Sequence, residues 1–169
     1  ADLAERYVAA SREAAAILAL REACAADTHG HSHHLRLGAL LRAQGSPAEA
    51  VDVLRHALQL RPGDGSTLYE LAQSLEKLGR TDEAWSALQQ AALARPEAAE
   101  PYLDLGRLTL AQLRKGVPSA SPLQAIAALR CAIERAPQMA EAYGLLAQAQ
   151  QLAAYAQGAL ESYQHARRL

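Results

Sequence analysis

Three histidines at alternate positions, His29, His31 and His33, are the residues of this chain best suited to chemistry. Imidazoles spaced in this way along a loop can bind one transition-metal ion. The simpler interpretation is a solvated loop between two helices, with the neighbouring His34 turned inward. We favour the simpler interpretation, so we expect neither a bound metal nor another cofactor.

Other reactive groups are few and poorly placed for catalysis. Cys24 and Cys131 fall in helical stretches far apart in the chain, and we interpret them as small buried side chains. A thiol nucleophile would need a histidine beside it in a cleft. The glycine-rich stretch 62–66 lacks the lysine of a phosphate-binding loop and indicates a turn between helices, while Glu97 and Glu100 indicate a helix start. We therefore predict no catalytic residues and a protein region that is not an enzyme.

Composition indicates a helical chain and limits its partners. Half of the 169 residues are hydrophobic, yet only 4% are aromatic and Phe is absent, so Ala and Leu dominate. Both residues favour helix strongly. The net charge of −1 lacks the basic excess of nucleic-acid binders, and the longest apolar run, 14–20, is shorter than the roughly 20 residues that cross a bilayer. We expect no nucleic-acid or membrane partner, a bacterial source, and a cytoplasmic location with the periplasm as the alternative.

One sequence pattern recurs with a fixed period. Pro62 and Pro96 lie 34 residues apart, and Pro137 follows after 41, which indicates a seven-residue insertion. Each unit opens with a large residue followed by a small one, and Gly45 and Gly79 mark a turn in the first two units. A second segment then places small, large and small residues at steps of four and three, which is one stripe of a helix. The opening pairs are Leu37-Gly38, Leu71-Ala72, Leu105-Gly106 and Leu146-Ala147. The stripes are Ala50/Leu54/Ala57, Ala84/Leu88/Ala91, Ala125/Leu129/Ala132 and Ala159/Tyr163/Ala166.

Helix boundaries are marked by residues with a known preference for helix ends. Residues 46–49, Ser-Pro-Ala-Glu, predict a capping box with proline in the first helical position. Residues 81–83, Thr-Asp-Glu, predict a capping residue and two acids at a positive helix end. Arg-Pro at 61–62 and 95–96 should end each second helix, because the residue before proline resists the helical conformation.

This pattern resembles the tetratricopeptide repeat family. The first large position of the family motif, usually Trp, is held here by His34, Leu68, Tyr102 and Tyr143. The resemblance implies an all-α fold, a right-handed superhelix of stacked antiparallel helix pairs with about four to five repeats in a single domain. We predict repeats at 31–64, 65–98, 99–139 with the insertion, and 140–169, after a degenerate N-terminal unit at 1–30. That first unit lacks a glycine turn; two helices are the favoured interpretation, and one long helix from about Asp2 to Ala26 is the alternative.

The resemblance also implies a concave wall, lined by the first helix of each pair, that binds an extended peptide or a partner helix. The residues expected on this wall are Leu35, Arg42, Tyr69, Gln73, Glu76, Lys77, Leu103, Arg107 and Gln148. The chain contains no Asn, which excludes the Asn-containing carboxylate clamp and the Asn ladder of other family members. We predict a non-enzymatic scaffold that binds a protein or peptide. The alternatives are a substrate-recruiting region of a larger bacterial enzyme, such as a transferase or hydroxylase, and an envelope assembly factor.

Two further segments depart from the regular pattern. The insertion near 114–122 should lengthen the first helix of the third unit and its loop, either as a specificity element or as a plain spacer. The last helix, about 155–168, has no polar capping repeat after it and should leave an apolar flank near Leu160 and Tyr163. Either the natural chain continues, or this end self-associates.

Overall fold

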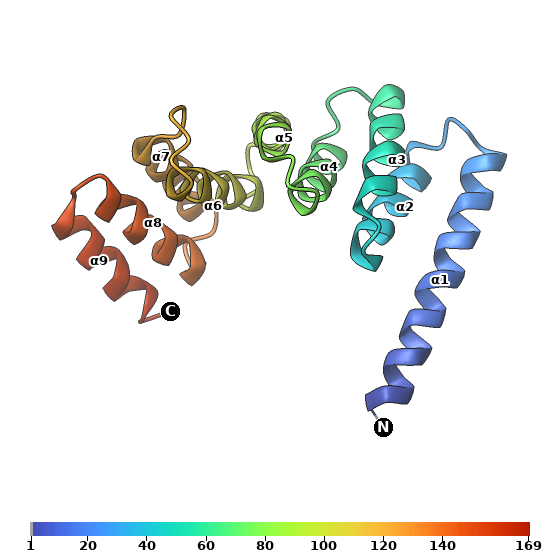
Figure 1. Ribbon diagram of the computed structural model, residues 1–169, viewed down its shortest axis with the longest axis horizontal. Helices are drawn as coiled ribbons and strands as arrows, with labels where there is room; N and C mark the ends of the chain where they lie inside the picture. Colours follow the sequence, from blue (N-terminus) through green and yellow to red (C-terminus); the bar gives the residue numbers. More distant parts are fainter. Residues whose placement is uncertain (1) are drawn as a thin grey trace. The chain divides into compact units, whose positions relative to one another are not determined.

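The computed structural model describes the backbone of residues 2–169 and the side chains of 12–155 and 157–169, and helices account for most of it (Figure 1). The helices are α1 (Asp2–Ala26), α2 (His31–Gln44), α3 (Pro47–Leu60), α4 (Gly65–Lys77), α5 (Thr81–Ala94), α6 (Glu100–Arg114), α7 (Pro122–Arg135), α8 (Ala140–Leu152) and α9 (Ala156–Ala166). Residues 2–169 include no strand, which confirms the predicted all-α class. Within the same range, no helix combines the length and the apolar character that a membrane span requires.

The chain divides into two compact units, Ala1–Ala87 and Leu88–Leu169. In the first unit α2 packs against α3, and α4 contacts both of them, while α1 packs against α2. In the second unit α6 packs against α7 and α8 against α9, and α8 also contacts α6 and α7. The first helix of one pair therefore touches the first helix of the next pair within each unit, as stacked helix pairs require.

The predicted large–small pairs explain how closely the paired helices approach. All members of these pairs are buried. A Cβ atom added to Gly38 of α2 would lie 2.5 Å from Cγ of Leu54 in α3. In the second unit a Cβ atom on Gly106 of α6 would likewise lie 2.5 Å from Cγ of Leu129 in α7. The glycine lets the leucine of the partner helix pack directly against the backbone.

Residues 2–26 form one helix of 25 residues, so the favoured two-helix interpretation of the degenerate N-terminal unit at 1–30 is wrong. The physical reason is local: this stretch contains no glycine or proline that would end a helix, and alanine dominates it. Three residues in its second half stand 34 positions before the stripe of α3 and are only half-buried: Ala16, Leu20 and Ala23. The equivalent stripe of α3, Ala50, Leu54 and Ala57, is 0% exposed.

A left-handed residue follows the first helix of each pair. Gly45, Gly79 and Gly116 take φ angles of 92°, 73° and 72°, which glycine adopts without steric cost. Ala154 takes the same position between α8 and α9 with φ 63°. A residue with a side chain is strained in this region, so the last turn departs from the glycine turns of the others.

The capping box predicted at 46–49 does not form. Ser46 precedes α3, but its side chain makes no capping hydrogen bond. Glu49, the other half of the predicted box, accepts instead from Arg21 of α1 at 2.6 Å. A complete capping box occurs at α7, where the hydroxyl of Ser121 accepts a backbone N–H and the backbone N–H of Ser121 donates to Gln124 at 3.0 Å.

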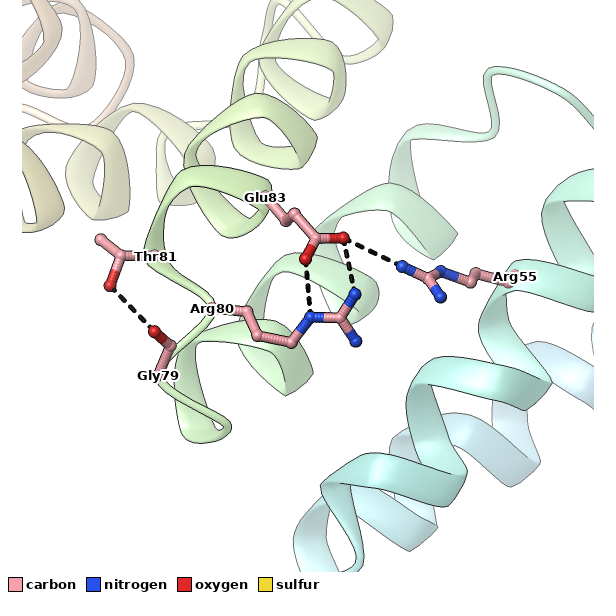
Figure 2. Close-up of polar contacts among 5 residues, drawn as sticks. All are labelled: Arg55, Gly79, Arg80, Thr81 and Glu83. Atoms are coloured by element: carbon pink, nitrogen blue, oxygen red, sulfur yellow. Dashed lines mark hydrogen bonds and ion pairs between the residues drawn. The ribbon is translucent and has the colours of Figure 1, made fainter.

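The cap predicted at Thr81 is also wrong. Thr81 is the first residue of α5, and its hydroxyl donates to the carbonyl oxygen of Gly79 at 3.3 Å (Figure 2). The predicted second-helix ends are correct, since α3 stops at Leu60 and α5 at Ala94, each before an Arg-Pro step. The predicted effect of the insertion is correct as well: α6 has 15 residues against 13 in α4, and the following turn is longer.

Candidate functional site

The residues predicted on the peptide-binding wall of the first unit lie on two neighbouring helices, α2 and α4. They are Leu35, Arg42, Tyr69, Gln73, Glu76 and Lys77. The first five are half-buried and Lys77 is exposed, so every one of them retains accessible surface. An aromatic ring, an amide and charges of both signs are thus available on one pair of adjacent helices.

Ionic contacts tie these two helices together. Arg42 Nε donates to Glu70 Oε2 at 2.8 Å, and each side chain is only 22% exposed. Lys77 Nζ donates to the carbonyl oxygen of Arg42 at 2.9 Å, and this carbonyl also accepts from the backbone N–H of Gly45 at the end of α2. Glu70 was missed by sequence reasoning. Because Glu70 neutralises Arg42, this pair of helices carries less positive charge than the predicted residues alone suggest.

The remaining predicted residues belong to the second compact unit. Leu103 on α6 packs against the buried cluster that contains Leu110, so it contributes to the core as well as to the surface. Arg107 donates to Asp104 at 2.9 Å. Gln148 on α8 accepts from Arg114 of α6 at 2.5 Å. The nine predicted residues are therefore divided between two units, and in each unit they lie on first helices.

Arginine–glutamate pairs repeat along the second helices of the first unit. Arg21 of α1 pairs with Glu49 of α3 at 2.6 Å, and Arg55 of α3 pairs with Glu83 of α5 at 3.0 Å (Figure 2). Both partners of the second pair stand 34 positions after those of the first. Arg80 also binds Glu83 at 2.6 Å, and its hydrogen bond lowers the pKa of Glu83. The matching pairs show that the second half of α1 takes the place of a second helix.

A buried polar network joins the first helices of the first unit. Asp64 precedes α4, and its Oδ2 accepts from the backbone N–H of Thr67 at 2.8 Å and from the Thr67 hydroxyl at 2.6 Å. His31 Nε2 of α2 lies 3.0 Å from that hydroxyl oxygen and 3.7 Å from Asp64 Oδ2. Partial burial acts to raise the pKa of Asp64, but the Thr67 hydrogen bonds, helped by His31 and Arg61, lower it.

The histidine-rich segment is not the loop that the sequence suggested, because residues 31–34 form the first turn of α2. His31 is engaged by Thr67, whereas His29 is exposed and precedes the helix. His34 is buried, as predicted, and stacks on His56 of α3 with ring centroids 4.5 Å apart. Among the described side chains, no three His, Cys, Asp or Glu residues are grouped to hold a metal ion.

Comparisons with known proteins agree with the repeat pattern of the sequence. Residues 41–113 match the family model described as tetratricopeptide repeat. The crystal structure of MamA superimposes with a TM-score of 0.83 and 21% identity, covering 99% of this chain and 94% of that chain. Residues 41–113 are therefore tetratricopeptide repeats, and the chain as a whole shares the fold of MamA.

Further structures of the family agree. A MamA fragment from Desulfovibrio magneticus RS-1 has a TM-score of 0.81 and 20% identity over 99% of this chain and 91% of that chain. YrrB, described as a TPR protein with an unusual peptide-binding site, has a TM-score of 0.75 and 19% identity over 98% of this chain and 81% of that chain. No sequence among the curated proteins matches. The chain therefore shares the fold of these solved structures.

The two cysteines of this chain are free and half-buried rather than fully buried. Cys24 lies in the first unit and Cys131 in the second. Partial burial and the charge of Asp27 raise the pKa of the Cys24 thiol, which lowers its fraction of reactive thiolate.

The apolar flank predicted at the last helix is present. Leu160 of α9 is 53% exposed, and Tyr163 is half-buried. Both line a hollow of 340 Å³ that is completed by Gln151, Ala154 and Ala159. The hollow lies on the surface of α8 and α9 within the second unit.

Replacing Asp64 with alanine is expected to lower the free energy of unfolding by about 1 kcal/mol at pH 7, because the change removes the cap of α4. The lowered pKa gives the sign of the pH dependence. A carboxylate whose pKa is lower in the folded state stabilises the fold above its unfolded pKa, and this contribution is lost as the pH falls through the folded pKa. The difference between wild type and variant should therefore shrink in strongly acidic solution.

Urea titrations of both proteins at pH 7 and at about pH 3 would measure this change. Asp52→Ala is the matched control, since Asp52 is an exposed acid on α3 that makes no ion pair with a described residue. A loss of equal size in the two variants would contradict the capping role of Asp64.

Proposed function

We propose that this tetratricopeptide repeat protein binds an extended peptide, or a segment of a partner protein, on the first helices of its repeats, without catalytic chemistry of its own. The observation that carries the proposal is the grouping of six accessible predicted residues on the neighbouring helices α2 and α4. YrrB, which has the same fold, is itself described as having a peptide-binding site, which supports the proposal.

The chemistry of these helices favours a peptide of mixed polarity. Tyr69 offers an aromatic ring for an apolar side chain, and Gln73 offers an amide that can both donate to and accept from a peptide backbone. The ammonium group of Lys77 has three donors, of which the Arg42 carbonyl takes one. Because Glu70 neutralises Arg42, a strongly acidic peptide would meet little uncompensated positive charge in this unit.

Peptides selected from a displayed random library against the whole chain provide the test. Binding of each selected peptide should weaken about tenfold or more in the double variant Tyr69→Ala, Gln73→Ala, because aromatic anchors commonly dominate such interfaces. Titration calorimetry measures the affinity, and circular dichroism checks that the variant is folded.

Leu18→Ala is the control, since Leu18 is 60% exposed on α1 and lies outside the predicted wall. Selected peptides that bind the double variant as tightly as wild type would show that the wall was placed on the wrong residues.

The same surface would serve a substrate-recruiting region of a larger enzyme or an envelope assembly factor. The encoded sequence beyond residue 169 and before residue 1 distinguishes these roles, since a catalytic domain supports the first and a signal peptide the second. The proposed location is the cytoplasm, and a signal peptide would replace it with the periplasm.

The exposed flank of the last helix favours self-association as a second binding role. Leu160 and Tyr155 are 53% and 54% exposed, and Leu160 borders the hollow on α8 and α9. Sedimentation velocity over a concentration series should reveal a dimer that Leu160→Asp dissociates. A monomer at every concentration would rule this role out.

A further inference from the structure

A second apolar hollow lies between α1 and α2 in the first unit, with a volume of 450 Å³. It is lined by Ala16, Ala19 and Leu20 of α1 and by Arg36, Ala39 and Leu40 of α2. All six residues are half-buried or exposed. We call this feature the α1–α2 hollow.

The place equivalent to the α1–α2 hollow is filled one repeat later. Leu54 of α3 stands 34 positions after Leu20, and it is 0% exposed because α2 lies against it, with Gly38 at the contact. Ser74 of α4 stands 34 positions after Leu40 and is also 0% exposed. A first helix thus fills the space between α3 and α4.

The second unit shows the same arrangement. Leu129 of α7 is 0% exposed, and Gly106 of α6 lies against it as Gly38 lies against Leu54. Residues 2–26 continue as one helix instead of folding back as a hairpin. For this reason the α1–α2 hollow lacks the first helix that fills the equivalent places of later repeats.

The charge at the α1–α2 hollow is opposite to the charge at the equivalent place one repeat later, between α3 and α4, which α2 fills. Between α2 and α4, Arg42 of the filling helix pairs with Glu70 of the next first helix. The residue of α2 equivalent to Glu70 is Arg36, which is exposed and makes no ion pair with a described residue. A helix that fills the hollow would therefore meet a positive charge where α2 meets a negative one.

We propose that the α1–α2 hollow binds an amphipathic helix of a partner protein. The helix places a small residue over Leu20, as α2 places Gly38 over Leu54, and a carboxylate four positions later against Arg36. Residues four apart lie on the same face of a helix, so one helix meets both requirements. This site is separate from the extended-peptide surface proposed above and accepts a different ligand conformation.

The chain contains two segments that test the charge requirement as synthetic probes. A peptide of residues 65–78 carries Ala72 and Glu76 at the two required positions, whereas a peptide of residues 31–44 carries Gly38 and Arg42. Both should be held helical by a side-chain cross-link on the opposite face, since helices this short are marginal in water. Fluorescence anisotropy of the labelled peptides with the whole chain measures binding.

The 65–78 probe should bind the wild-type chain at least about threefold more tightly than the same probe with Glu76→Arg, because like charges across an interface disfavour binding. The protein variant Arg36→Glu should reverse this order and should prefer the 31–44 probe. Leu20→Glu should abolish binding of both probes. Leu18→Glu, an exposed position of α1 outside the hollow, should change neither affinity.

The proposal is overturned if Arg36→Glu leaves the preference between probes unchanged, or if the 65–78 probe does not bind at about millimolar concentration. A dimer of the chain that Leu20→Glu or Arg36→Glu dissociates would identify a second copy as the occupant and would also overturn it. The variant Tyr69→Ala, Gln73→Ala should bind the helical probes normally, so the outcome is independent of the extended-peptide surface.

Discussion

Replacing Leu54 with alanine is expected to lower the free energy of unfolding by about 2–5 kcal/mol. Leu54 is 0% exposed and fills the space directly beneath Gly38 of α2. Truncation removes buried apolar area and leaves a cavity between two helices that are already in close contact. Trp85, the sole tryptophan, belongs to the same compact unit as Leu54. Its fluorescence during denaturant titration therefore measures the loss of stability of that unit.

Leu20→Ala is the matched control for this change. Leu20 holds the same position in the repeat but is only half-buried, because it borders the α1–α2 hollow. Part of its apolar area already contacts water, so its truncation should cost less than about 1.5 kcal/mol. Losses of equal size for Leu20→Ala and Leu54→Ala would mean that the hollow is filled in solution.

Adding one methyl group at Gly38 or Gly106 should destabilise the protein by about 1–3 kcal/mol through overpacking. In an ordinary helix the same change stabilises by about 1 kcal/mol, because glycine is a poor helix former. At these two positions the new Cβ would lie 2.5 Å from Cγ of Leu54 or Leu129, both 0% exposed. The branch carbon of a buried leucine has no free space into which it could move, so the steric cost exceeds the helix-forming gain.

Gly144→Ala is the control for Gly38→Ala and Gly106→Ala. Gly144 lies in α8, and a Cβ there would meet no other atom within 4 Å. Thermal unfolding followed by circular dichroism should show this variant as stable as wild type or more stable. In the first unit, combining Gly38→Ala with Leu54→Ala should cost less than the sum of the single changes, since the smaller side chain accommodates the methyl group. Strict additivity would contradict direct contact between these residues.

The helix pairs could be predicted because their determinants are periodic and local. The large–small pairs and the Ala/Leu/Ala stripes are buried where the sequence placed them, apart from the last stripe, where Tyr163 and Ala166 are half-buried. The helix content of the degenerate N-terminal unit at 1–30 was harder to predict. A stripe of the right spacing does not indicate whether a second helix precedes it as a hairpin partner. The absence of Gly and Pro from residues 2–26 was the better guide.

Features that depend on partners distant in the chain could not be predicted from the sequence. The pattern at 46–49 had the form of a capping box, but Arg21 from α1 holds the carboxylate of Glu49. The partner of Arg42 at the candidate wall was missed for the same reason, since Glu70 binds Arg42 from a different helix. A regular signal was nevertheless present, since Arg21–Glu49, Arg42–Glu70 and Arg55–Glu83 all join residues 28 positions apart.

The arginine–glutamate pairs of the second helices have a consequence for how such a chain can change in length. Arg21 reaches Glu49, and Arg55 reaches Glu83, across one repeat in each case. Deletion of a whole repeat, such as residues 31–64, would bring Arg21 and Glu83 to a sequence separation of 28, which is the present separation of Arg21 and Glu49. A gene could therefore lose or duplicate entire repeats by recombination while each arginine still acquires an acidic neighbour, whereas insertions of other lengths would break the correspondence.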